Sequence, residues 1–352
     1  MRNRPSLSPD ESKHIMQKPI SNANVFSGPD ALKRFLDPDC NPPVPLVELP
    51  DGLNPFAGQK VRIFAKLLYL LPLLNLKSLP VLKMLQEASD KLDSVHTIVE
   101  NSSGNTAFSL AIMARLFGIH SVRAIVPIDI APGKLELLRL AGADVRFAPP
   151  EGGGVALARR MGKRPGFLNL DQYGNPANVA SHAMWTAQQV WDQTNGKLTI
   201  YCAGLGTTGT ALGAVRFFRE KDSGVTVVGT YCLPEAAVPG VRSIERLREV
   251  AFDWEAEVPN RVGAGTSESY KKSLDLCRSG LMAGPSSGFA LAGLLRFLEQ
   301  QPDLDRFRNS DGEIVTAFIC CDTPFPYLDK YSTILDPGDF IVAGAKHNEA
   351  ED

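Results

Sequence analysis

The feature that most constrains the fold of this chain is an alternation of short β-branched runs with longer segments whose apolar residues recur at helical spacing. The run HTIVEN at 96–101 and the run SVRAIVP at 121–127, for example, flank the helical pattern NTAFSLAIMARLFG at 105–118. Strand-helix-strand units of this kind build parallel sheets that are covered by helices. The alternation therefore predicts an α/β protein.

The same pattern indicates where the strands and helices lie. Expected strands are 61–70, 96–101, 121–127, 144–150, 197–204 and 225–232, and expected helices are 105–118, 131–143, 181–194 and 210–221. A stretch rich in glycine and charge at 151–166 breaks the series. Because strand-helix units stand on both sides of the region 150–180, we expect two parallel sheets, each in a three-layer domain.

Composition excludes several classes of protein. The 352 residues fit about two domains, and 37 basic against 39 acidic residues leave a charge of −2, which provides no basic surface for nucleic acid. The most apolar window, LLYLLPLLNL at 67–76, is about half of the ~20 residues that a membrane span needs. Six cysteines without CxxC or ligand spacing predict reduced thiols and no metal. With no apolar signal segment at the N-terminus, we expect a cytoplasmic protein with no membrane partner.

Ligands of parallel sheets bind at the carboxyl ends of the strands, so polar turns after strands are where chemistry is expected. The turn ENSSGNTAF at 100–108 follows one expected strand and opens a helix. Its polar side chains, beside the unpaired N–H groups of a helix start, form a receptor for an anion. These side chains belong to Ser102, Ser103, Asn105 and Thr106. A simple helix cap, which needs only one of them, is the alternative.

A second turn, AGLGTTGTALG at 203–213, also lies between an expected strand and an expected helix. Its glycines match the GxGxxG fingerprint of dinucleotide-binding folds, but the next strand does not end in the acid that would bind a ribose. Its hydroxyls and backbone amides suit a terminal phosphate monoester instead. The residues expected to hold this phosphate are Gly206, Thr207, Thr208, Gly209 and Thr210. A purely structural glycine turn is the alternative.

Two further features are ambiguous on their own. The turn AGPSSGFALAG at 283–293 fits a plain helix cap as well as it fits a ligand site. Lys77 lies in the apolar run PLLNLKSLP, where a lysine either extends its ammonium to solvent or is held in a dry pocket. A desolvated lysine has a lowered pKa and is suited to Schiff-base chemistry.

The motifs and their order resemble those of the cysteine synthase and cystathionine β-synthase family. In chain order they are a lysine in P-x-x-N-x-K, then SSGNT, QYGNPAN, GLGTTGT and GPSSG. Members of this family are fold-type II enzymes, similar in fold to the β subunit of tryptophan synthase, and they use pyridoxal 5′-phosphate. The resemblance implies a flexible tail at 1–22, a large cofactor-binding domain at 23–68 and 180–340, a small mobile substrate-binding domain at 69–179, and a tail at 341–352.

The resemblance also implies a role for each matching residue. Lys77 would form the internal aldimine with the cofactor and act as the base at Cα of the substrate. The substrate α-carboxylate would be bound by Ser103, Asn105, Thr106 and Gln172, and Asn105 would also reach the 3′ oxygen of the cofactor. The turn from Gly206 to Thr210 would hold the cofactor phosphate. Thr323 would contact the pyridine nitrogen, with Asp322 as the neighbouring possibility.

A neutral hydroxyl at the pyridine nitrogen favours β-elimination over transamination. The implied activity is a pyridoxal 5′-phosphate-dependent β-replacement, in which a β-substituted L-amino acid of the O-acetylserine, O-phosphoserine or serine type reacts through an aminoacrylate intermediate. The family resemblance also implies a homodimer, the commonest assembly of soluble enzymes.

Two departures from the family pattern concern the second substrate. The flank of Lys77 differs from the usual one, and VPGVRSIERLRE at 238–249 replaces the usual glycine-rich substrate segment. We therefore expect a product other than cysteine. Arg242 in this segment suits a second anion, either a carboxylate or a phosphate of a substrate. A solvated arginine at a helix start is the alternative.

Three other activities compete with β-replacement. A pyridoxal 5′-phosphate-dependent serine or threonine dehydratase of the same fold would release an α-keto acid. An NAD(P)-dependent oxidoreductase could use GLGTTG, although one glycine fingerprint is weak evidence. A non-catalytic binding protein could also use this scaffold, but the presence of Lys77 argues against it.

Overall fold

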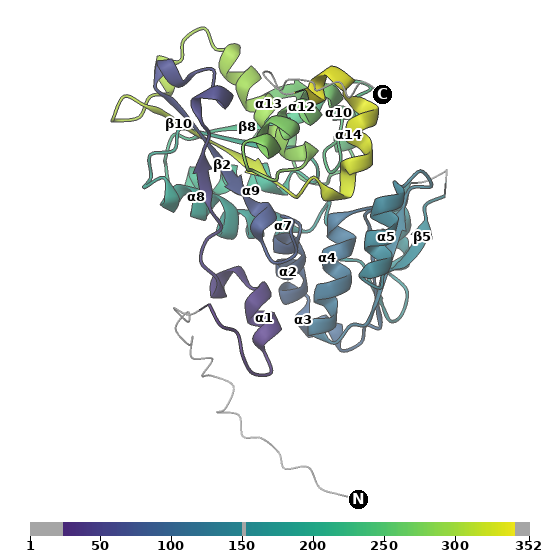
Figure 1. Cartoon of the computed structure of the whole chain (residues 1–352). Coiled ribbons are helices and arrows are strands. Elements are labelled where there is room, and N and C mark those ends of the chain that lie inside the picture. Colours follow the sequence, from purple (N-terminus) through teal and green to yellow (C-terminus); the bar gives the residue numbers. More distant parts are fainter. Residues whose placement is uncertain (1–23, 150–152, 342–352) are drawn as a thin grey trace, which may run out of the picture. The chain divides into compact units, whose positions relative to one another are not determined.

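The computed structural model describes residues 24–149 and 153–341 (Figure 1). The predicted tail at 1–22, and the predicted tail at 341–352 from residue 342 on, lie outside these residues. The chain divides into an N-terminal unit that ends at Pro42 and a main unit that begins at Pro43. In the N-terminal unit, helix α1 (Ala31–Leu36) is followed by a 3₁₀ turn at Pro38–Cys40. The Asn41 side-chain amide donates to the main-chain carbonyls of Arg34 in α1 and of Asp37, which precedes the turn. No helix among the described residues is long and apolar enough to span a bilayer.

The main unit contains a six-stranded sheet with the order β1-β2-β10-β7-β8-β9. Its strands are β1 (Leu46–Glu48), β2 (Val61–Leu67), β7 (Ile200–Gly204), β8 (Thr226–Cys232), β9 (Asn260–Ala264) and β10 (Ile314–Cys320). Only the edge pair β1 and β2 is antiparallel. Strands β2 and β10 pair in parallel from Val61–Ile314 to Leu67–Cys320, although more than 240 residues separate them in the chain.

Helices cover both faces of this sheet because its crossovers run in opposite directions. The chain goes from β7 to β8 through α9 (Gly209–Glu220) and returns from β9 to β10 through α12 (Thr266–Arg278) and α13 (Pro285–Glu299). Right-handed crossovers in opposite directions place their helices on opposite faces, and Figure 1 shows α9 and α13 on either side of the strands. Helix α7 (Pro176–His182) packs beside α9.

A second sheet, with the order β5-β4-β3-β6, is parallel throughout. Its strands are β3 (Thr97–Asn101), β4 (Ser121–Val126), β5 (Asp144–Phe147) and β6 (Phe167–Leu168). Its helices are α4 (Asn105–Met113), α5 (Pro132–Leu140) and α6 (Gly154–Met161). Helix α2 (Ser78–Glu87) packs against both α4 and α7 and so links this sheet to the helices of the larger one.

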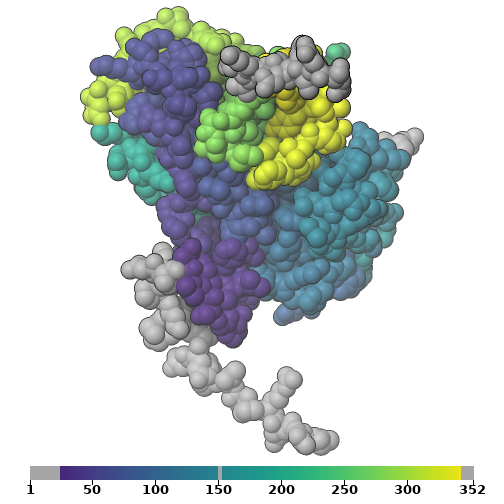
Figure 2. All heavy atoms as spheres, in the orientation of Figure 1, coloured from purple at the N-terminus to yellow at the C-terminus, as the bar shows by residue number. Residues whose placement is uncertain are grey.

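The remaining short helices are α3 (Ser89–Leu92), α8 (Gln188–Gln193), α10 (Ile244–Leu247), α11 (Trp254–Glu257) and α14 (Leu328–Ile334). Figure 2 shows the yellow C-terminal residues lying against the blue residues of the four-stranded part. One contact there is Lys134 of α5, whose Nζ lies 5.2 Å from the centre of the Tyr327 ring.

The expected α/β architecture with two parallel sheets is confirmed, and each of the six expected strands contains a strand of the structure. Two local expectations were wrong. The strand expected to reach residue 70 ends at Leu67 and continues as a 3₁₀ turn. The stretch 151–166, expected to break the pattern, contains α6, whose Val155, Ala158 and Met161 recur every three residues and are buried.

Helices α12 and α13 approach each other so closely that only glycine fits at position 288. A Cβ there would lie 2.1 Å from the carbonyl oxygen of Ser269 and 2.4 Å from the backbone nitrogen of Ser273. Backbone atoms cannot rotate away as a side chain can, so a larger residue would push the two helices apart.

We therefore expect Gly288→Ala to reduce the free energy of unfolding by about 1–3 kcal/mol. Thermal unfolding of the variant and of the wild type measures this change. Gly52→Ala is the matched control, because nothing lies within 4 Å of a Cβ at position 52. Equal melting temperatures for Gly288→Ala and the wild type would contradict the expectation.

Candidate active site

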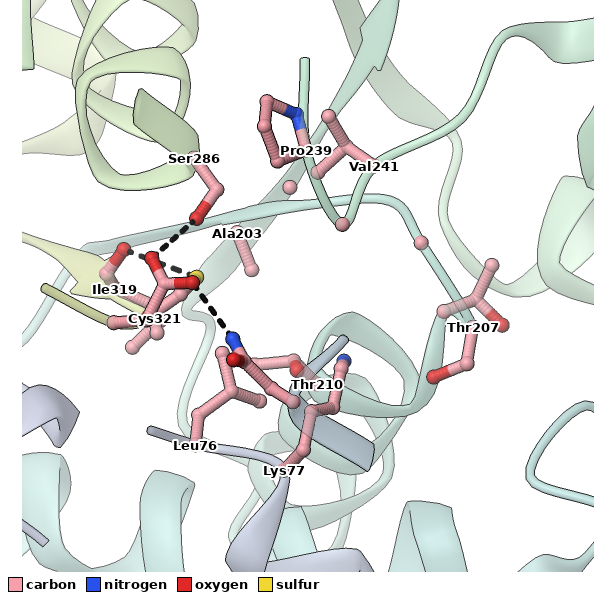
Figure 3. A pocket seen from close by; sticks show the side chains of 16 residues that line it. Leu76, Lys77, Ala203, Thr207, Thr210, Pro239, Val241, Ser286, Ile319 and Cys321 are labelled. Carbon is pink, nitrogen blue, oxygen red and sulfur yellow. Dashed lines mark hydrogen bonds between the residues drawn. The ribbon is translucent and has the colours of Figure 1, made fainter. Parts of the chain in front are cut away.

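A pocket lies at the carboxyl ends of β7 and β10, where Figure 3 shows its lining side chains; its empty space is about 490 Å³ when the adjoining open solvent is included. The lining residues are Leu76, Lys77, Asn105, Ala203, Gly204, Gly206, Thr207, Thr208, Thr210, Pro239, Gly240, Val241, Ser286, Ile319, Cys321 and Asp322. Three turns singled out in the sequence therefore contribute to one pocket, together with Lys77. This is the position at which open parallel sheets bind their ligands.

Lys77 is fixed in the pocket by the loop that leaves β2. The backbone N–H of Leu76 donates to the carbonyl of Cys321 at 2.8 Å, which ties this loop to the end of β10. The Asn75 side chain accepts the N–H of Lys77 at 2.9 Å. Helix α2 begins at the next residue, Ser78, so Lys77 lies at a helix start with its backbone held on both sides.

The Lys77 amine is suited to nucleophilic chemistry. Burial lowers its pKa, although the nearby Cys321 and Asp322 act in the opposite direction. Within the described part of the chain, the Lys77 amine has no hydrogen-bond or ion-pair partner, and Figure 3 shows it pointing into the pocket. An amine with a lowered pKa and a free lone pair can attack a carbonyl group.

The turn between β7 and α9 forms a cradle of backbone that a larger residue would fill. A Cβ at Gly206 would lie 2.2 Å from the carbonyl oxygen of Gly240, and one at Gly209 would lie 2.2 Å from Oδ1 of Asn178. Gly209 begins α9, a helix of 12 residues whose first N–H groups face the turn. These close approaches explain why both positions are glycine. The GxGxxG pattern of this turn therefore does not require a bound dinucleotide.

The backbone of this turn is strained at Thr208. Its φ of 65° is left-handed, a conformation that costs a β-branched residue free energy. Its buried hydroxyl has no hydrogen-bond partner within the residues described, and a buried polar atom without a partner is expensive in a folded protein. An anion at the helix start would complete the bonding of this hydroxyl.

The other two threonines of the turn are held by α7. The Asn178 side chain donates to Thr207 Oγ1 at 2.9 Å and to the carbonyl of Gln172 at 2.7 Å. The Thr210 hydroxyl lies 3.3 Å from Nε2 of His182. Burial, and to a smaller extent the nearby Lys77, lower the pKa of His182 to about 3, so this imidazole is neutral. Sequence reasoning missed His182, which shows no motif beyond its place in a helix.

The polar residues of the turn before α4 make different contacts. The Ser102 hydroxyl accepts the backbone N–H groups of Gly104 at 3.3 Å and Ala107 at 3.4 Å, so it caps the helix. Ser103 is partly buried beside it. The Thr106 hydroxyl donates to Oε1 of Gln172 at 2.8 Å, which brings together two residues predicted to bind the substrate.

Asn105 faces the pocket and contacts Asp322. Its Nδ2 donates to Oδ2 of Asp322 at 2.6 Å, and the Tyr327 hydroxyl donates to the same oxygen at 2.6 Å. Asp322 lines the pocket, whereas Thr323 is absent from the described lining. Burial raises the pKa of Asp322, while the hydrogen bonds from Tyr327 and Asn105 lower it. The pocket lining as described thus contains the carboxyl group of Asp322, and the contact of Thr323 with the pyridine nitrogen stays a prediction.

Arg242 does not line the pocket as described, although Val241 beside it does. Its guanidinium donates to Oε2 of Glu249 at 2.8 Å and lies 4.3 Å from the centre of the Tyr173 ring. These partners occupy the group that was predicted to bind a substrate anion. The geometry thus favours a structural role for Arg242 in holding the segment 238–249.

Ser286 and Cys321 also line the pocket, and sequence reasoning assigned neither of them a role. The Ser286 hydroxyl lies 3.4 Å from Oδ1 of Asp322. Burial raises the pKa of Cys321 to about 12, so its thiol is protonated. The GPSSG turn, which fitted a helix cap equally well, was the signal that could have indicated Ser286.

Comparison with known proteins connects this geometry to a chemistry. The sequence model of a family described as pyridoxal-phosphate dependent enzymes matches residues 39–307. The chain belongs to this family. The enzyme is 31% identical over 293 residues to cysteine synthase B of Salmonella typhimurium, which covers 78% of the chain and 89% of the relative. It is 29% identical over 283 residues to cystathionine beta-synthase of Apis mellifera, covering 74% of the chain and 56% of the relative.

Solved structures share the fold of the enzyme. An O-ureido-L-serine synthase superimposes with a TM-score of 0.71 at 22% identity, over 84% of the enzyme and 94% of that chain. A hydrogen sulfide-producing enzyme from Fusobacterium nucleatum superimposes with a TM-score of 0.69 at 20% identity, over 81% and 96% of the two chains. The fold-type II architecture expected from the sequence motifs is thereby confirmed.

The pocket fits the cofactor of the family, pyridoxal 5′-phosphate. The unpartnered Thr208 hydroxyl and the start of α9 offer donors to a phosphate, and the Lys77 amine is available to an aldehyde. A phosphate site and an aldehyde-reactive amine in one pocket are the two features that this cofactor requires.

Two substitutions separate the effect of the free Thr208 hydroxyl from the effect of its backbone strain. Thr208→Ala and Thr208→Gly both remove the hydroxyl, so we expect each to weaken cofactor binding by about tenfold to a hundredfold. Glycine adopts the left-handed conformation without cost, so the glycine variant should be more stable than the alanine variant by about 1 kcal/mol. Cofactor titration of the apo-enzymes and their thermal unfolding measure the two effects. Unchanged cofactor affinity in both variants would count against the phosphate cradle.

Proposed function

We propose that the enzyme replaces the β-substituent of an L-amino acid of the O-acetylserine, O-phosphoserine or serine type with a nucleophile other than sulfide. The observation that carries this proposal is the position of the Lys77 amine, which is free, desolvated and in the same pocket as the phosphate cradle and Asn105. A β-replacement needs these three components together. They are a group that holds the cofactor and moves the Cα proton, an anchor for the phosphate, and a site for the substrate.

Lys77 is proposed to hold the cofactor and to take the proton from Cα of the substrate. When bound, pyridoxal 5′-phosphate withdraws electrons from the bonds at Cα, which makes that proton acidic. The lowered pKa of Lys77 increases the fraction of neutral amine, the form that accepts a proton. The proton can then be carried by the same amine while the β-substituent leaves.

The turn before α4 is proposed to bind the substrate α-carboxylate through Ser103, Asn105 and Thr106, with Gln172 across from them. Thr106 and Gln172 are already joined by a hydrogen bond of 2.8 Å. The side-chain amide of Gln172 also donates to the carbonyl of Asn101 at 2.9 Å. These bonds hold Gln172 next to a helix start whose N–H groups favour an anion.

The choice of a nucleophile other than sulfide rests on the residues around the cofactor site. Pro239, Gly240 and Val241 of the segment 238–249 line the pocket, and this segment departs from the usual family pattern. The carboxyl group of Asp322 also lines it. A carboxylate in a partly desolvated pocket disfavours an incoming anion such as hydrosulfide and favours a nucleophile that carries N–H or O–H donors.

Products identify the reaction. Mass spectrometry would follow O-acetyl-L-serine, O-phospho-L-serine and L-serine, each offered with sulfide and with a panel of amines, amides and hydroxyl compounds. We expect a β-replaced amino acid with at least one nitrogen or oxygen nucleophile. Accumulation of an α-keto acid alone would identify a dehydratase, and cysteine as the best product would overturn the choice of nucleophile.

The role of Lys77 is tested separately from the identity of the substrate. In Lys77→Ala we expect no covalent link to the cofactor after borohydride reduction, together with loss of turnover, because no amine remains to react with the aldehyde. Lys83→Ala is the matched control, since Lys83 lies on helix α2, which begins directly after Lys77, and pairs with Glu87 instead. A reduced, covalently bound cofactor in Lys77→Ala would contradict the assignment.

We also propose that the enzyme is a cytoplasmic homodimer, with a large domain at 23–68 and 180–340 and a small mobile substrate-binding domain at 69–179. The boundaries follow the two sheets, since the strands of the six-stranded sheet come from both sides of the four-stranded one in the chain. The mass in solution by light scattering tests the dimer, and twice the monomer mass of 38.2 kDa is expected.

A further inference from the structure

A buried carboxyl group lies directly behind the turn proposed to bind the substrate carboxylate. Glu100 is the last residue but one of β3, and only 1% of its surface is exposed. Burial, and to a smaller extent the nearby Asp171, raise the pKa of Glu100 to about 8. A glutamate in such a place is unfavourable unless its oxygens are well bonded. The chemistry proposed above makes no use of this group.

Two amide donors from two separate segments hold this carboxyl group. The backbone N–H of Asn101 donates to Oε1 at 3.2 Å, and Nδ2 of Asn169 donates to Oε2 at 3.2 Å. The nearby backbone N–H groups of Asp171 and Gln172 also lower the pKa of Glu100. One hydrogen bond therefore comes from the end of β3, and the other comes from the loop after β6. A carboxylate can accept all of these bonds, because it has about four lone-pair positions.

The two segments that Glu100 joins are those that carry the proposed substrate contacts. Asn101 leads into the turn of Ser103, Asn105 and Thr106, and its carbonyl accepts a hydrogen bond from the Gln172 side chain at 2.9 Å. Gln172 in turn accepts the hydroxyl of Thr106. Glu100 thus bonds to both segments beside the set of bonds that fixes the distance between the turn and Gln172.

Backbone strain supports a functional reason for this arrangement. Asp171, which precedes Gln172, has a φ of 55°, in the left-handed region. Its carboxylate is held by two hydrogen bonds of 3.0 Å from Arg159. Strained residues persist where their surroundings over-determine them, and they gather at ligand sites.

We propose that Glu100 is a positioning residue that holds Gln172 and the turn 101–106 in the geometry that binds the α-carboxylate of the substrate. The inference rests on the proposed function of that turn. Because the α-carboxylate does not change its charge in the reaction, loss of its binding geometry raises KM more than it lowers kcat. If Glu100 served only to join β3 to β6, its substitution would change the stability of the enzyme and would not raise KM more than it lowers kcat.

Two substitutions of Glu100 and one control test the inference. Glu100→Gln keeps the shape but turns one acceptor into an N–H group that faces other N–H groups. Glu100→Asp keeps both acceptor oxygens and withdraws them by one methylene, and it carries the test if the glutamine variant does not fold. Ile98→Val is the matched control, because Ile98 is fully buried in the same strand and contributes no polar contact to the loop.

Two measurements on the holoenzymes give the outcome. We expect amide hydrogen exchange to increase about tenfold or more at 101–106 and 171–172 in the Glu100 variants, with no change at 204–210. We also expect the Kd of the tightest-binding amino acid among L-serine, O-acetyl-L-serine and O-phospho-L-serine to rise about tenfold to a hundredfold, measured from the visible spectrum of the cofactor. Cofactor content should stay at the wild-type level.

The exchange measurement needs no substrate, so it separates failure of this inference from failure of the proposed function. Unchanged exchange at both segments in the Glu100 variants, or the same increase in Ile98→Val, would overturn the positioning role. Increased exchange with unchanged amino-acid affinity would overturn it as well. If the wild type binds none of the three amino acids, the proposed function fails, and the exchange pattern still decides whether Glu100 holds the two segments.

Discussion

The hydrogen bond from the N–H of Leu76 to the carbonyl of Cys321 is the contact on which the pocket most depends. It ties the loop that leaves β2 to the end of β10, and the next residue along this loop is Lys77. Parallel strands bring their carboxyl ends to one edge of a sheet, but that places backbone only. This additional bond places a reactive side chain at the shared edge, because it puts the Lys77 amine beside the carboxyl group of Asp322 and opposite the turn at 204–210.

Desolvation sets the charges of the site. Burial lowers the pKa of Lys77 and of His182, and it raises the pKa of Asp322 and of Glu100. Each buried group therefore moves toward its neutral form, and hydrogen bonds determine which of them can remain charged. Glu100 and Asp322 each accept several donors, whereas the Lys77 amine is left without a partner among the described residues. Lys77, the residue that must react, is thus the buried group to which no described residue offers a hydrogen bond or an ion pair.

Much of this arrangement could be predicted from the sequence, because turns after strands and hydroxyl-rich helix starts have local signatures. Three features could not be predicted. Thr323 and Asp322 are neighbours, and only the path of the chain after β10 decides which side chain enters the pocket. Arg242 finds its partners in Glu249 and in the distant Tyr173, which no local pattern indicates. Glu100 is the last residue but one of a strand, where a glutamate is ordinarily solvated, and its burial depends on a loop some 70 residues later.

The pairing of β2 with β10 also determines when this enzyme can become active during its synthesis. Strand β2 lies near the start of the chain, yet its parallel neighbour β10 begins at Ile314. A ribosome adds about 5–20 residues per second, so β2 waits for more than ten seconds before its partner leaves the exit tunnel. The four-stranded sheet, whose strands lie between residues 97 and 168, is complete long before then. Lys77 therefore reaches its final environment only after translation has passed Cys320, and the nascent chain is incapable of the reaction until then.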